Sequence, residues 1–139
     1  MKITYDQGLL QYMSLFENFT KAKLKDCFYD ENLAALTFIV QPGELGKAVG
    51  KKGETIKHVG QLLKKRIRVI EFSEDKLQFI KNMVQPLQVD SIEERGGKVV
   101  LQSADVKIKG LLIGKNAKNL RNLEKNVGRY FEVEEIRVE

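Results

Sequence analysis

Apolar residues along the first half of the chain recur with the two periods that distinguish helices from strands. Leu9, Met13 and Phe16 stand at i, i+4 and i+7, the stripe of an amphipathic helix, and Asp6 is placed to cap its start. Short apolar runs bounded by turn residues follow, which is typical of strands. The elements predicted for the first half are a helix at 6–19, strands at 24–29 and 34–40, a short helix at 44–49, a helix at 54–65 and a strand at 67–72.

The second half of the chain repeats this order of elements. Its first helix has a capping sequence at 73–75, apolar residues at helical spacing, and a stop at Pro86. The elements predicted after it are strands at 89–95 and 98–103 around a Gly96-Gly97 turn, a short helix at 106–113, a helix at 118–127 and a strand at 130–138. The match between the halves predicts an α+β protein with two small domains, 1–72 and 73–139.

A glycine-lysine turn joins the two helices in the middle of each half. The first copy is Gly50-Lys51-Lys52-Gly53, and an altered copy, Gly114-Lys115-Asn116-Ala117, begins 64 positions later. Glycines at both ends let the backbone approach a ligand closely, and the helix that starts there offers unpaired N–H groups and the positive end of its dipole. These features favour phosphate as the ligand. We expect the methyl group of Ala117 to narrow the approach at the second copy.

The excess positive charge of the chain lies in the two stretches that contain these turns. Residues 43–72 hold eight basic and three acidic residues, and residues 104–131 hold seven basic and two acidic residues. Each stretch is therefore as positive as the whole chain, whose net charge is +5, and the remaining stretches are slightly acidic. A generic solvated surface spreads its charge more evenly. The partition is typical of a protein that grips a polyanion at two places.

Composition argues against several classes of function. Hydrophobic residues make up 42% and charged residues 31%, as in a folded globular protein, and no apolar run is long enough to cross a membrane. Because the N-terminus has no signal pattern, we expect a cytoplasmic protein. One cysteine and one histidine supply no disulfide and no soft metal site; we expect Cys27 to be buried and His58 to face solvent or a ligand. No catalytic motif is present, so we expect neither an enzyme nor a cofactor.

Glycine-lysine turns also occur in structures of different kinds. A plain connection between helices can use glycines for geometry and lysines for solubility. A P-loop nucleotidase needs four residues between its glycines and then Lys-Ser/Thr, whereas three residues separate Gly46 from Gly50 and Lys51 is followed by Lys52. A DNA-binding helix-hairpin-helix favours a G-x-G spacing, which neither copy has. The spacing therefore disfavours the P-loop and the helix-hairpin-helix, and leaves the plain connection open.

The segment from Val49 to Ile56 resembles the signature of KH domains, in which a G-x-x-G loop joins two helices and clamps the backbone of about four single-stranded nucleotides. The helix and strand that precede this core resemble the type II arrangement with its three-stranded sheet. Two such units joined directly are similar to the archaeal NusA-like family of transcription termination and antitermination factors. The resemblance covers nearly the whole chain.

This resemblance implies an α+β fold of two tandem type II KH domains, 1–72 with an intact G-x-x-G and 73–139 with a G-x-x-A variant. It implies binding of single-stranded RNA in the regulation of transcription elongation or termination, with RNA polymerase or other transcription factors as partners. We expect a monomer that lacks the polymerase-binding N-terminal domain and the S1 domain of bacterial relatives. A ribosomal-RNA-binding assembly module or a protein-interaction module is the alternative. The expected RNA-binding residues, flanking cations included, are Lys47, Gly50, Lys51, Lys52, Gly53, Lys57, Gly114, Lys115, Asn116, Ala117, Lys118 and Arg121.

Overall fold

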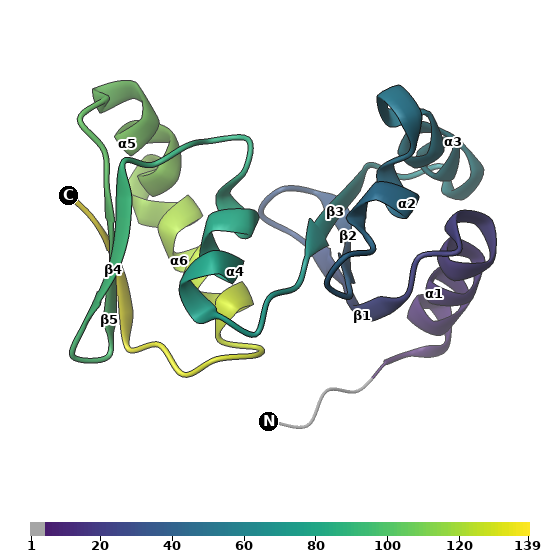
Figure 1. Ribbon diagram of the computed structural model, residues 1–139, viewed down its shortest axis with the longest axis horizontal. Helices are drawn as coiled ribbons and strands as arrows, with labels where there is room; N and C mark the ends of the chain where they lie inside the picture. Colours follow the sequence, from purple (N-terminus) through teal and green to yellow (C-terminus); the bar gives the residue numbers. More distant parts are fainter. Residues whose placement is uncertain (1–4) are drawn as a thin grey trace. The chain divides into compact units, whose positions relative to one another are not determined.

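The computed structural model describes residues 5–139, which form two compact units (Figure 1). One unit ends at Ser73 and the other runs from Glu74 to Glu139. Residues 1–4 of the expected first domain lie outside the described residues. Each unit has its own three-stranded sheet, with its helices on one face of that sheet.

The first unit contains three helices and three strands in the predicted order. In its sheet β2 is central, antiparallel to β1 and parallel to β3. The carboxylate of Asp6 caps the first helix by accepting a hydrogen bond from Leu9 N at 2.7 Å, as predicted. The elements are α1 (Gln7–Thr20), β1 (Leu24–Asp30), β2 (Ala35–Val40), α2 (Leu45–Val49), a single 3₁₀ turn η1 (Lys51–Gly53), α3 (Glu54–Leu63) and β3 (Ile67–Glu71).

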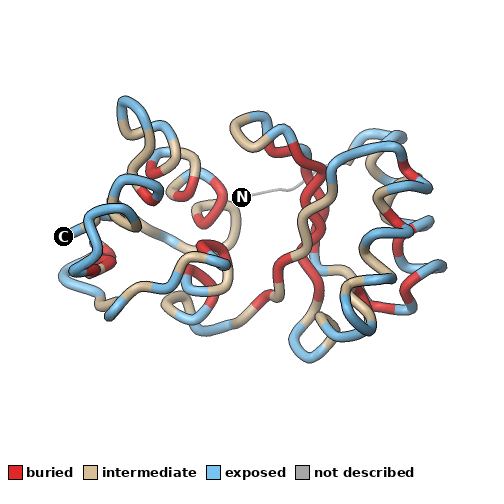
Figure 2. The backbone as a smooth tube through the Cα atoms, turned by 90° about the horizontal axis from the view of Figure 1, so that it is seen from above, coloured by how far each residue is buried: buried red, intermediate tan, exposed pale blue. Residues whose placement is uncertain are grey.

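The core of the first unit lies between its sheet and its helices. The rings of Phe16 and Phe38 stack with their centroids 4.1 Å apart, which joins α1 to the central strand. Ala48 of α2 and Val59 of α3 are fully buried against the same cluster. Cys27 is buried here too, as predicted. Figure 2 shows the buried residues running along the strands while the outer faces of the helices are exposed.

The second unit repeats the order and the sheet topology of the first. Its central strand is antiparallel to the strand before it and parallel to the last strand. The elements are α4 (Lys76–Val84), β4 (Ser91–Arg95), β5 (Lys98–Gln102), α5 (Val106–Ile113), a 3₁₀ turn η2 (Lys115–Ala117), α6 (Lys118–Val127) and β6 (Glu135–Val138). The prediction of an α+β fold whose sheets pack against helices is therefore confirmed.

The last strand is much shorter than predicted, because β6 begins at Glu135 and not at residue 130. The N–H groups of Tyr130 and Phe131 both donate to the carbonyl of Val127 at 3.0 Å, which extends the end of α6 as a turn. Both rings pack against Phe79 of α4, with centroids 5.3 and 5.8 Å away. Tertiary packing of the aromatic residues thus overrides their preference for strands.

The start of α4 also differs in detail from the prediction. Asp75, the last residue of the predicted capping sequence, is the N-cap, and its carboxylate accepts a hydrogen bond from Leu77 N at 3.0 Å. The first turn of the helix contains no acidic residue. The helix ends at Val84, before Pro86 as predicted, and the Gln85–Pro86 peptide bond is cis.

Candidate nucleic-acid interface

The first glycine-lysine turn is a compact left-handed connection between α2 and α3. Gly50 ends α2 with φ 76° and donates its N–H to the carbonyl of Gly46 at 2.9 Å. Lys52 and Gly53 both have positive φ, 55° and 75°, and Gly53 N donates to Gly50 O at 3.2 Å. Gly53 is the N-cap of α3 and has no side chain to satisfy the first N–H groups of the helix. The turn therefore presents a helix start without a side-chain cap beside two exposed lysines.

Gly50 is required by packing as well as by its backbone angles. A Cβ built on Gly50 would lie 2.1 Å from Thr55 Oγ1 and 3.0 Å from the backbone nitrogen of the same residue. Gly50 thus packs directly against Thr55 at the start of α3. A Cβ on Gly53 would meet only Ile56 Cγ2, at 4.0 Å, so only the positive φ favours glycine there.

The second turn has almost the same backbone as the first. Gly114 has φ 74° and ψ 174°, against 76° and 175° at Gly50. Asn116 and Ala117 take the left-handed conformations of Lys52 and Gly53, with φ values of 57° and 59°. Ala117 N donates to Gly114 O at 3.2 Å, the distance found in the first turn. The substitution of glycine by alanine leaves the path of the chain unchanged.

Asn119 occupies in the second unit the position of Thr55 in the first, and sequence reasoning missed both residues. Its Nδ2 donates to the carbonyl of Leu111 at 2.9 Å, which satisfies one of the free carbonyls at the end of α5. A Cβ on Gly114 would lie 2.6 Å from Asn119 Cγ. The available signal was that short polar side chains, which bond readily to nearby backbone, stand five residues after the first glycine in both copies.

The structure places the predicted site residues on the two turns and on the first turns of the helices that follow them, except Lys47, which lies on α2 before the first turn. The side chains of Lys51, Lys52 and Lys57 are exposed, as are those of Lys115, Asn116, Lys118 and Arg121. Two predicted cations are already paired within their own units. Lys47 Nζ lies 3.2 Å from Glu44 Oε2, and Arg121 Nη1 donates to Glu124 Oε1 at 2.8 Å.

The local charge differs between the two helix starts. Glu54 is the first residue of α3, whereas Lys118 is the first residue of α6. A carboxylate at this position interacts favourably with the helix dipole but competes with a bound anion, and a lysine does the reverse. The second unit therefore has one cation fewer at the tip of its turn and one more at the start of its helix.

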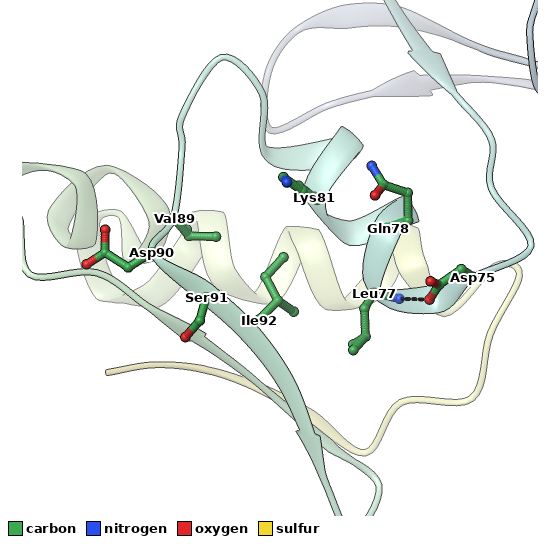
Figure 3. Close-up of a pocket in the computed structure, with 8 residues that line it drawn as sticks. All are labelled: Asp75, Leu77, Gln78, Lys81, Val89, Asp90, Ser91 and Ile92. Carbon is green, nitrogen blue, oxygen red and sulfur yellow. Dashed lines mark hydrogen bonds between the residues drawn. The ribbon is translucent and has the colours of Figure 1, made fainter.

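The second unit also has a hollow between α4 and β4, with a volume of about 230 Å³ (Figure 3). Several polar residues that line it make hydrogen bonds that stabilise the fold. Asp75 caps α4, Asp90 Oδ2 accepts a hydrogen bond from Ala104 N at 2.8 Å, and Ser91 Oγ donates to Gln102 Oε1 at 2.7 Å. Within residues 5–139, no group of three or more His, Cys, Asp or Glu side chains is placed to hold a metal ion. The hollow is therefore a poorer candidate for a site than the two turns.

A family model described as KH domain matches residues 11–109. The chain belongs to the KH domain family. The match contains the first glycine-lysine turn and extends through β5 into α5 of the second unit. The two glycines of the first turn, its two lysines and the helix that follows it are the features of the sequence that predict this family.

Relatives of this chain include archaeal proteins named as probable transcription termination protein NusA. The chain is 31% identical to the protein of Methanococcus vannielii over 99% of its own length and 80% of the relative. Its identity to the protein of Methanocaldococcus jannaschii is 31% over 91% and 69% of the two chains, and to that of Halococcus morrhuae 28% over 98% of each. The resemblance to the archaeal NusA-like family is thereby confirmed.

A solved structure has a closely similar fold. The crystal structure of APE1850 superposes with a TM-score of 0.74 at 32% sequence identity, covering 97% of this chain and all of that one. The likeness extends over both units. For the described part of the KH protein, no helix is long and apolar enough to cross a membrane.

Proposed function

We propose that the protein binds single-stranded RNA through two tandem type II KH domains, 1–72 and 73–139. The observation that carries this proposal is the repetition of one turn, with matching φ and ψ, between equivalent helices of two units with the same topology. A plain helix connection has no need to repeat exposed cations and an uncapped helix start in both units. Phosphate groups use both features, because backbone N–H groups and lysines are the usual ligands of phosphate in proteins.

In this proposal each turn clamps the sugar-phosphate backbone. Gly50, Lys51, Lys52 and Gly53 form the first clamp, with Lys57 one turn further along α3. The second clamp consists of Gly114, Lys115, Asn116, Ala117, Lys118 and Arg121. Lys47 extends the basic surface of the first clamp once RNA competes with Glu44 for its ammonium group.

The names of the archaeal relatives favour a role in the regulation of transcription elongation or termination. We propose that the protein acts by binding nascent RNA, as a cytoplasmic monomer, with RNA polymerase or other transcription factors as further partners. The proposed activity is binding without catalysis, and it requires no cofactor.

Replacing Lys51 and Lys52 by aspartate tests the first clamp. The change reverses the charge at the tip of the turn, so we expect the affinity for single-stranded RNA to fall by at least about tenfold in a filter-binding assay. The matched control is Lys64→Asp with Lys125→Asp, which makes the same change of charge near the far ends of α3 and α6. Equal losses in the two variants would show that only net charge matters and would contradict the clamp.

Comparing RNA substrates separates the proposal from its alternative. We expect tighter binding to an unstructured oligonucleotide than to a folded ribosomal RNA fragment of equal length. Tighter binding to the folded ribosomal RNA fragment would support a ribosome-assembly module, provided that the Lys51→Asp, Lys52→Asp variant loses this preference. Circular dichroism of each variant checks that the fold is kept.

A further inference from the structure

Helices α1 and α3 of the first unit form an exposed line of side-chain contacts. Phe19 and His58 lie edge to face with ring centroids 6.3 Å apart, and Lys65 Nζ lies 5.8 Å from the centroid of Tyr12. These two pairs show that the helices run antiparallel. Leu15 stands one helical turn from both Tyr12 and Phe19 on α1, and Leu62 stands one helical turn after His58 on α3, so both leucines lie between the two pairs. We call the line of Leu15, Phe19, His58 and Leu62 the α1/α3 seam.

Three large apolar side chains of the seam are exposed and do not contribute to the core of the unit. Leu15 is 44%, Phe19 46% and Leu62 53% exposed, while the core of the unit is closed beneath them by Phe16 and Val59. Single exposed apolar residues are common on protein surfaces, but a contiguous group of large ones marks an interaction surface.

The second unit, which the structure describes throughout residues 74–139, has no equivalent apolar line, although its helices are related by the same repeat. The positions of α6 that correspond to His58 and Leu62 of α3, 64 residues further on, are Asn122 and Asn126. Asn126 is buried, with 4% of its surface exposed. The KH topology therefore does not require exposed apolar residues at this place, and the seam is a property of the first unit alone.

The surroundings of the seam are basic. Exposed lysines flank it at Lys21 after the end of α1, at Lys57 beside His58, and at Lys64 and Lys65 after α3. Helices α1 and α3 contain only two carboxylates. Glu17 accepts a hydrogen bond from Leu24 N at 2.9 Å, and Glu54 stands at the start of α3 beside the turn. An occupant with apolar anchors and acidic flanks fits this distribution.

We propose that the α1/α3 seam docks an acidic amphipathic helix of a partner protein. A third helix laid along two antiparallel helices buries apolar residues at i, i+3 or i+4, and i+7, which matches the spacing of Tyr12, Leu15 and Phe19. The lysines pair with acidic residues on either side of that stripe. RNA fits the seam less well, because Leu15 and Leu62 cannot stack on bases and the N–H groups along the sides of helices are already bonded. This proposal does not depend on the RNA clamp, with which the seam shares only the flanking Lys57.

A synthetic peptide tests the seam on the full chain. The probe is a fluorescent helical peptide of about 14 residues, rich in glutamate, with leucines at i, i+4, i+7 and i+11, which is roughly 21 Å long. Two control peptides have the same composition with the leucines scattered round the helix, or lysine in place of glutamate. We expect binding of the first peptide only, with NMR shift changes at Leu15, Phe19, His58 and Leu62.

Variants of the protein then locate the binding. Leu15→Ser with Leu62→Ser is expected to weaken peptide binding by at least about tenfold. Val106→Ser with Leu111→Ser is the matched control, because both side chains are exposed on α5 of the second unit, and it should leave the affinity unchanged. An unchanged circular dichroism spectrum shows that each variant is folded, as we expect for substitutions at exposed positions.

Several results would overturn the proposal. The seam does not recognise an acidic amphipathic helix if the scattered-leucine peptide binds with the same affinity as the first peptide. The same conclusion follows if the first peptide does not bind at all. If Leu15→Ser with Leu62→Ser lowers the affinity for a single-stranded RNA oligonucleotide as much as for the peptide, the seam belongs to the RNA site. If sedimentation shows a dimer that this variant dissociates, the occupant is a second copy of the chain.

Discussion

At the scale of single residues, Gly53 and Ala117 hold the same left-handed backbone with different side chains. A non-glycine residue with φ near 60° is strained by contact of its Cβ with the following carbonyl. We therefore expect Ala117→Gly to raise the free energy of unfolding by about 1 kcal/mol and Gly53→Ala to lower it by a similar amount. Urea denaturation of the two variants measures both changes.

The Ala117→Gly and Gly53→Ala variants serve as controls for each other, because each makes the reverse of the other's change. Both substitutions exchange one methyl group at an intermediate, solvent-accessible position, so transfer of apolar surface contributes little to either change. If both variants lose stability, local contacts of the methyl group and not the backbone angle decide the outcome. A Gly50→Ala change should be more destabilising than Gly53→Ala, since its Cβ has no room beside Thr55.

The sequence was enough to locate these residues but not to account for them fully. Spacing identified Gly50 and Gly114, because both stand between apolar-periodic helices. It suggested that glycine serves close approach by a ligand, whereas the structure shows that Gly50 is also packed on Thr55. Contacts five residues apart across a left-handed turn depend on its φ and ψ values, which periodicity does not specify. The prediction that Ala117 narrows access to the phosphate stays a prediction.

At the scale of elements, one carboxylate links the start of α2 to the residue that precedes β1. Glu44 Oε1 accepts a hydrogen bond from Lys23 N at 2.9 Å, and Glu44 Oε2 pairs with Lys47 at 3.2 Å. The hydrogen bond from Lys23 is the main cause, and that from Lys47 the second, of a pKa of Glu44 below its usual 4.5. Both favour the ionised form.

The lowered pKa makes the stability of the first unit depend on pH. A carboxyl group whose pKa is lower in the folded state stabilises the fold above its usual pKa of 4.5, and this contribution is lost as the pH falls through the folded value. We expect Glu44→Gln to reduce the loss of stability between neutral and acidic pH. NMR titration of the Glu44 carboxyl carbon should give a pKa below 4.5.

The Lys47→Met variant separates the two causes of this shift. It removes the ion pair but keeps the backbone N–H of Lys23, so we expect the pKa of Glu44 to rise without reaching its usual value. A complete return to that value would show that Lys47 alone holds the carboxylate.

Most elements were predictable because each carries a clear period or a strong cap. Helices α5 and α6 have the bounds that were predicted, since apolar spacing and a glycine delimit them. The strand predicted at 130–138 was wrong over its first half, where Tyr130 and Phe131 turn back onto Phe79. Aromatic residues favour strands locally, and only the tertiary fold places a partner ring within reach.

At the scale of the whole molecule, the concentration of charge in two stretches has a structural counterpart in the two turns. The sequence could predict this because the repeat and the charge windows are both linear features. It could not predict the α1/α3 seam, since Phe19 and Leu62 each look like members of an apolar helix stripe. Their exposure depends on which side of the helix pair faces the core.

The two turns should differ in how strongly salt opposes their binding of RNA. For single strands, log K falls with log salt by about 0.7 for each phosphate neutralised. Replacing Lys51 and Lys52 by glutamine removes two cations from the first tip, so the slope should shrink by about 1.4. Lys115→Gln removes the one cation at the second tip, where Asn116 is neutral, and should change the slope by about 0.7.

Aspartate variants extend this comparison to affinity at fixed salt. We expect Lys115→Asp with Asn116→Asp to weaken RNA binding less than Lys51→Asp with Lys52→Asp, because fewer contacts are lost and Lys118 and Arg121 remain beside the second turn. Filter binding across a salt series measures slope and affinity together. An equal or larger loss at the second turn would mean that Ala117 permits full backbone approach and that the second clamp contributes at least as much to binding as the first.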